Sequence, residues 1–156
     1  MRIKEDSIVK PLPFDSLIKS QEDYWRLKLP TSFVAFIKEN NGAEVEATTF
    51  DCDGRERMIE RFLCILGDVQ LNPDGMYDIG VVLTQIEDRL SDTEDLIGAD
   101  VLPIAVLFAG DFVCLDFRKD ADNPVVCVWS HEESEYCDPV LYNVADNFAD
   151  FLTLLD

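Results

Sequence analysis

The sequence is poor in the residues from which most metal and cofactor sites are built. It contains a single histidine, His131, and no two of its five cysteines stand two to four residues apart. A structural zinc site needs closely spaced pairs of such ligands, so the spacing argues against one. None of the seven glycines forms part of a glycine-rich turn of the kind that cradles phosphate groups. We therefore expect no metal and no cofactor.

The scarcity of histidine also limits catalysis. A Ser–His or Cys–His nucleophile would have to use His131. This residue ends a predicted strand and is followed by Glu132, Glu133 and Glu135, a pattern typical of an exposed strand end. Pairs of carboxylates carry little information in a chain with 32 acidic residues. We predict that the protein is not an enzyme and has no catalytic residues, with an enzyme using His131 or a carboxylate pair as the alternative.

Basic residues and long hydrophobic runs are also scarce. Thirteen Lys and Arg stand against 32 Asp and Glu, which gives a net charge of −19. Nucleic acids and anionic membranes are polyanions that require a basic face, so we expect neither as a partner. The longest apolar run, 101–110, has about half of the roughly 20 residues that a membrane span needs. A charge-driven partner of this chain should be a basic protein.

The start of the chain and the cysteines bear on its location. Residues 1–7 are charged and lack the apolar core of a secretory signal. Five cysteines cannot all pair, and most stand inside apolar runs such as 62–66 and 125–129. They are best interpreted as reduced, buried small hydrophobic residues. A cytoplasmic protein is the expectation.

The acidic residues are distributed unevenly. Residues 1–40 hold seven bases and six acids, whereas residues 41–156 hold six bases and 26 acids. Between Phe62 and Phe117 the single base, Arg89, is outnumbered by eleven acids. Two polar stretches outside the predicted helices and strands concentrate the charge, and they supply our candidate partner-binding residues: Asp92, Glu94, Asp95, Glu132, Glu133, Glu135 and Asp138. The alternative is that these acids serve only solubility.

Hydrophobic periodicity predicts an α+β fold. Helical spacing of apolar residues, with Pro30 as the first residue of the second helix, predicts helices over 14–28, 30–40, 79–90 and 141–155. Alternating or continuous apolar runs predict strands over 44–50, 58–66, 101–108, 112–118 and 125–131. The last two are apolar on both faces, which is typical of strands inside a covered sheet. We expect one domain over 1–156, with a mostly antiparallel sheet, N-terminal helices, one inserted helix and a C-terminal helix packed on it.

Four short motifs, at 29–42, 102–105, 110–116 and 126–131, occur in an order that resembles the SUKH superfamily, in its Smi/Knr-type branch. The stretch 29–42 resembles the "L-P, helix with an aromatic, N-G" signature of that family. The stretches 102–105, 110–116 and 126–131 resemble its "P-I-A", "G-D…L-D" and "V…W…H" strands. The matching residues are Leu29, Pro30, Phe36, Gly42, Pro103, Gly110, Asp111 and Trp129.

This resemblance implies an α+β binding domain without catalytic residues, in which most of the eight matching residues are structural. Bacterial members of the family are largely immunity proteins that neutralise toxins, many of them nucleases. Fungal members regulate cell-wall synthesis through protein contacts. The first hypothesis is thus an immunity protein that binds a basic, secreted toxin domain through its acidic residues. The alternative is a regulatory or scaffold protein with a partner that is not a toxin.

Overall fold

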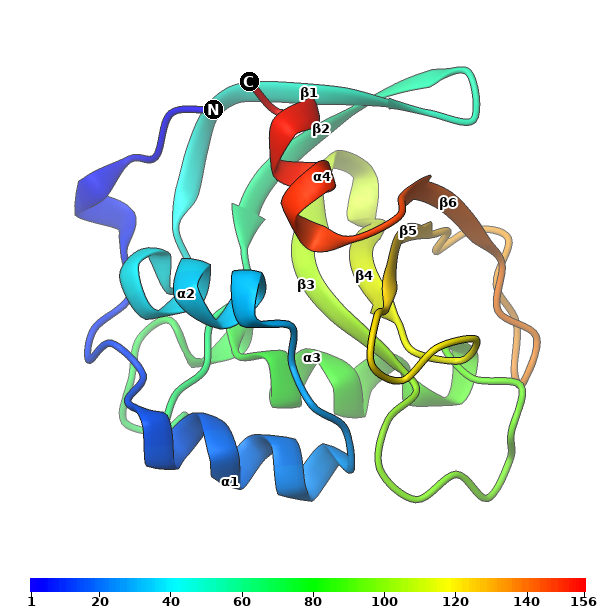
Figure 1. Ribbon diagram of the computed structural model, residues 1–156, viewed down its shortest axis with the longest axis horizontal. Helices are drawn as coiled ribbons and strands as arrows, with labels where there is room; N and C mark the ends of the chain where they lie inside the picture. The colour runs from blue at the N-terminus through cyan, green and yellow to red at the C-terminus, as the bar shows by residue number, and fades with distance from the viewer.

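A computed structural model describes all residues, 1–156, and shows four helices and one six-stranded sheet (Figure 1). The helices are α1 (Asp15–Trp25), α2 (Thr31–Asn40), α3 (Ile79–Ile86) and α4 (Phe148–Leu154). The strands are β1 (Glu44–Cys52), β2 (Arg55–Phe62), β3 (Val101–Leu107), β4 (Phe112–Asp116), β5 (Val125–Trp129) and β6 (Leu141–Ala145). The strands are neighbours in chain order and every pair is antiparallel. The predicted α+β class is confirmed.

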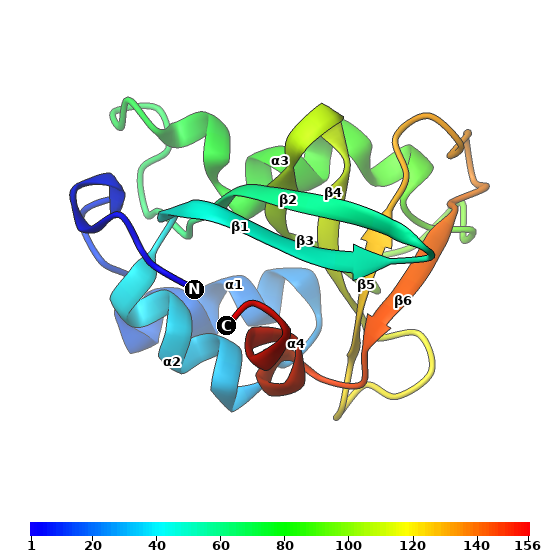
Figure 2. The same cartoon turned by 90° about the horizontal axis from the view of Figure 1, so that it is seen from above.

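The helices cover both faces of the sheet. Helices α1, α2 and α4 lie on one face and α3 lies on the other (Figure 2). Between α2 and α4, the rings of Phe33 and Phe148 pack edge to face with centroids 5.2 Å apart. The ring of Phe36 packs on that of Phe62 in β2 with centroids 4.6 Å apart, and this contact joins α2 to the sheet. Aromatic pairs of this kind contribute beyond the area that they bury.

Strands β4 and β5 occupy inner positions of the sheet, as their two-sided apolar character predicted. Every residue of each strand except the first is buried. Cys114 and Cys127 stand opposite each other in this pair of strands, and both are fully buried. Helices on both faces leave no side of these strands for water, so alternation with polar residues is absent.

The prediction of a single helix over 141–155 is wrong over residues 141–147. Residues 141–145 form β6, and α4 begins only at Phe148. Asn147 is the N-cap of α4, since its side chain accepts a 2.8 Å hydrogen bond from the backbone N–H of Asp150. Leu141, Val144 and Ala145 have helical spacing, but they form a strand that pairs with β5. Without this partner, the edge of β5 would leave buried backbone groups unsatisfied.

Other boundaries differ by a few residues. Helix α1 ends at Trp25 because Arg26 takes a left-handed conformation (φ 58°). Helix α2 begins at Thr31, with Pro30 at the N-cap position instead of inside the helix. Strand β2 covers Arg55–Phe62 instead of 58–66, although the residues after it remain buried. The predicted helix 79–90 ends in a 3-10 turn, Glu87–Arg89.

Pro103 lies inside β3, which is an inner strand of the sheet. It pairs with Cys114 of β4 at a β-bulge, and pairing with β2 begins only at Ala105. The proline therefore occupies the part of β3 that extends beyond the β2 ladder, where its missing N–H removes no ladder hydrogen bond.

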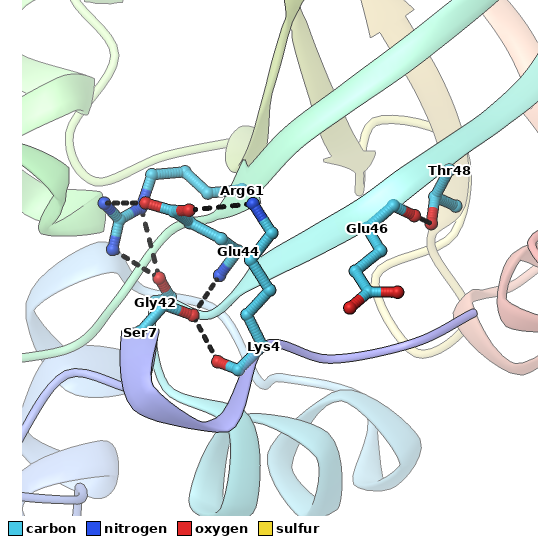
Figure 3. A network of polar contacts seen from close by, with 7 residues as sticks. All are labelled: Lys4, Ser7, Gly42, Glu44, Glu46, Thr48 and Arg61. Carbon is cyan, nitrogen blue, oxygen red and sulfur yellow. Dashed lines mark hydrogen bonds and ion pairs between the residues drawn. The ribbon is translucent and has the colours of Figure 1, made fainter.

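A polar network around Glu44 and the buried Arg61 joins the N-terminal segment to the sheet (Figure 3). Arg61 donates from Nε and one terminal nitrogen to the carbonyl of Gly42, at 3.1 and 2.6 Å, and lies 3.8 Å from a carboxylate oxygen of Glu44. Its guanidinium also stacks 3.9 Å from the centre of the Tyr77 ring. Ser7 and Lys4 then bind Glu44, the hydroxyl of Ser7 accepting from its backbone N–H at 2.8 Å and the ammonium of Lys4 pairing with its carboxylate at 3.3 Å. Residues 1–9 are thereby held along β1.

Candidate functional site

The fold brings the two predicted acidic stretches side by side. One follows the 3-10 turn Glu87–Arg89 and the other follows β5, yet the hydroxyl of Tyr136 donates to Glu94 at 3.0 Å and the N–H of Cys137 donates to the Asp88 carbonyl at 2.7 Å. The two loops lie next to each other at one end of the molecule (Figures 1 and 2). We call the seven predicted acids the acidic surface. All seven are exposed: Asp92, Glu94, Asp95, Glu132, Glu133, Glu135 and Asp138.

Arg89 holds the two loops together. Its guanidinium donates to the carbonyl of Ser134 from two nitrogens, at 3.1 and 2.9 Å, and to the carbonyl of His131. Its own carbonyl accepts the indole N–H of Trp129 at 2.8 Å, and its guanidinium lies 5.2 Å from that indole ring. The single base of the acidic region thus serves as the clamp between the loops. Sequence reasoning missed this role, although the isolation of Arg89 among eleven acids was the available signal.

We predict that Arg89→Met loosens the acidic surface without changing the sheet. A hydrogen bond from a charged donor is worth about 2 kcal/mol, and the variant loses those to the carbonyls of His131 and Ser134. Amide hydrogen exchange should become faster in residues 130–138, while β4 and β5 keep their protection. Arg2→Met removes the same charge from an exposed side chain paired with Glu46 and is the matched control. Equal exchange in the two variants would contradict the clamp.

Two tyrosines are hydrogen-bonded to acids of this surface. The hydrogen bond from Tyr136 to Glu94 raises the pKa of the phenol to about 12. Tyr142 donates to Glu133 at 2.5 Å, which likewise raises the pKa of its phenol. Each hydrogen bond joins one exposed acid of the surface to a tyrosine side chain.

A pocket of about 140 Å³ opens between the loops. We call it the acidic pocket. Its charged lining consists of Glu87, Asp88 and Glu94, with Tyr136 on the other side and no basic residue. Its chemistry matches the head of a lysine or arginine side chain, because carboxylates only accept hydrogen bonds when ionised and these cations only donate them.

Asp111 and Trp129, two of the residues that resemble the family signature, support the acidic surface from beneath. One carboxylate oxygen of Asp111 pairs with Arg57 at 2.7 Å, and the other accepts the backbone N–H of His131 at 2.8 Å. Trp129 is fully buried and binds the carbonyl of Arg89. Both therefore fix where the loops begin.

The other signature residues have structural surroundings. Gly42 has a φ of +65°, and a Cβ there would lie 2.6 Å from Cγ2 of Val9. Gly110 has a φ of +92° in the turn between β3 and β4. Leu29 is buried and Phe36 packs between Phe62 and Phe148. Their side chains or backbones serve the core and its turns.

The structure assembles no nucleophile around His131. Its ring is exposed, and the one hydrogen bond of the ring joins Nδ1 to Arg89 at 3.4 Å. All five cysteines are free, and burial raises the pKa of the Cys64 thiol to about 12, so that it stays protonated and unreactive. No three histidine, cysteine or acidic side chains are grouped so that they could hold a metal ion. None of the helices combines the length and the hydrophobicity of a membrane-spanning segment.

Comparison with protein families gives a match over most of the chain. The SUKH_6 family model, described as SMI1-KNR4 cell-wall, matches residues 15–152. The chain belongs to this family. Membership in SUKH_6 confirms the resemblance drawn from the motifs and supports an immunity-protein or related role in general terms. Neither the curated proteins nor the solved structures give a significant match.

Proposed function

We propose that this SUKH_6 protein is a non-catalytic immunity protein that neutralises a basic toxin domain through its acidic surface. The observation that carries the proposal is the joining of two separate acidic loops, through the contacts of Tyr136 with Glu94 and of Arg89 with Ser134, into one surface around a pocket without bases. A surface of this kind complements a cleft that has evolved to hold phosphate groups, such as that of a nuclease toxin. The seven acids are its proposed binding residues.

Electrostatics supports this assignment in kinetic terms. Opposite potentials raise association rates toward about 10⁸ M⁻¹ s⁻¹. An immunity protein has to reach its toxin before the toxin reaches its substrate, so a fast association has direct value. The loops that carry the acids are held by hydrogen bonds to buried residues, and this reduces the entropy that is lost on binding.

The description of the matching family supports a second candidate function. Because the matching family is described by a cell-wall role, a regulatory or scaffold protein that binds a non-toxin partner is the alternative. Genomic context separates the two. A toxin gene directly upstream supports the immunity protein, whereas a lone gene among envelope functions supports the regulator. Either role needs a protein contact and no catalytic group, and we place either in the cytoplasm.

Co-expression with the product of the adjacent gene tests the immunity function. We expect that product to arrest growth when expressed alone and to be harmless when this protein is present. The acidic-surface variants described in the Discussion should fail to protect at equal expression levels. A neighbour that is not toxic, or that stays toxic in the presence of this protein, would show the assignment to be wrong.

A further inference from the structure

A partly apolar groove lies beside the acidic pocket. Its walls come from the last turn of α1, from α3 and from residues 96–98, and its volume is about 230 Å³. Tyr24, Leu96 and Ile97 line it and are 76%, 37% and 69% exposed, respectively. Figure 1 shows the loop after α3 beside the end of α1. We call this feature the Tyr24–Ile97 groove.

The groove is held in shape by backbone contacts. The N–H of Ala99 donates to the carbonyl of Trp25 at 2.8 Å. Gly98 has a φ of +87°, and a Cβ at this position would lie 2.4 Å from the same carbonyl oxygen. Only glycine lets the loop approach α1 so closely. The exposed side chains of Leu96 and Ile97 thus stand on a fixed segment, and a preformed site loses less entropy on binding.

The groove and the acidic pocket are two sides of one surface. Glu87, Leu96 and Gly98 line both. Glu87 is the single charged residue in the lining of the groove, and the pocket adds Asp88 and Glu94, again without a base. Binding interfaces commonly combine an apolar centre with a charged rim. The charge of this rim selects a basic occupant and disfavours a second copy of the chain, which also carries −19.

We propose that the Tyr24–Ile97 groove binds an apolar side chain of the basic partner, while lysine or arginine residues that flank it lie against Glu87, Asp88 and Glu94. This inference rests on the proposed function, because it names the partner chemistry of the same surface. The apolar contact supplies the part of the affinity that salt does not screen. The acids supply the rate of association and the selectivity.

A random library of displayed peptides of about 12 residues tests this pairing, since short peptides bind through such anchors. Selection on the wild-type protein should enrich an aromatic or aliphatic residue flanked by Lys or Arg. Ile97→Ser should weaken the enriched peptides at least about fivefold, as truncation of a central apolar contact does. Leu71→Ser is the matched control, because Leu71 is 84% exposed and lines a different apolar groove near the start of α1.

Three results would overturn the inference: no enrichment of such sequences, equal loss with both serine variants, or concentration-dependent dimerisation that Ile97→Ser abolishes. The co-expression test is independent of this one. Protection from a toxin together with failure of the peptide result would remove only the groove proposal. Enriched peptides that depend on Ile97, without any toxin, would keep the groove and remove the immunity function.

Discussion

Replacement of Asp111 by alanine is expected to lower the free energy of unfolding by about 3 kcal/mol, the usual cost of leaving one partner of a buried ion pair alone. The side chains of Asp111 and Arg57 are only 11% and 16% exposed. Without the carboxylate, the guanidinium has no counter-charge, and the backbone N–H of His131 loses its acceptor. The loss is measured by urea unfolding and should lower the melting temperature by about 10 °C.

Two further variants isolate the cause of this loss. Adding Arg57→Met to Asp111→Ala should recover part of the stability, because it removes the unpaired charge. Glu46→Ala breaks the pair with Arg2, in which the side chain of Arg2 is 80% exposed and that of Glu46 is 51% exposed. This variant should lower the free energy of unfolding by less than about 1 kcal/mol. If Asp111→Ala costs no more than Glu46→Ala, the ion pair is not a structural anchor.

Charge reversal of the acidic surface is expected to have the largest effect on partner binding. The triple variant Asp92→Lys, Asp95→Lys and Glu132→Lys leaves the tyrosine-bound acids Glu94 and Glu133 in place. We expect association with the proposed basic toxin domain to slow about 10- to 100-fold at low salt, with most of the salt dependence lost, because steering acts through the local potential. Stopped-flow association at two or more ionic strengths measures both effects.

A matched triple variant carries the same change in net charge elsewhere. Glu5, Asp6 and Glu39 are exposed and belong to the nearly neutral first 40 residues. Their reversal to lysine should change the association rate by less than about threefold, because exposed charges farther away than the Debye length of about 8 Å are largely screened. If the two triple variants slow association equally, net charge and not the acidic surface governs binding.

Some features of the site could be predicted because they depend on composition and local pattern. The acids at 92–95 and 132–138 were identified as exposed loop residues, and they are exposed, although their binding role stays a prediction. Pairing between distant segments could not be predicted. The isolation of Arg89 among acids marks it as unusual, but it does not indicate that Arg89 reaches the carbonyls of His131 and Ser134, since hydrogen bonds to backbone atoms leave no trace in residue type.

The same reasoning explains the error at the C-terminal end. The spacing of Leu141, Val144 and Ala145 fits a helix, and local propensity alone would extend α4 backwards. The open edge of β5 decides otherwise, because its buried backbone groups require a partner strand. The secondary structure of a short apolar segment is decided by the segments that lie next to it in the fold.

Residue pattern and composition are enough to predict the α+β class, the covered inner strands and the acidic character of the chain. These follow from periodicity and charge counts, which are properties of the chain before it folds. The tertiary structure alone decided that two acidic loops share one surface, that Arg89 clamps them and that an apolar groove adjoins them. Those features depend on contacts between residues about 40 or more positions apart, such as Tyr136 with Glu94, and only the fold creates them.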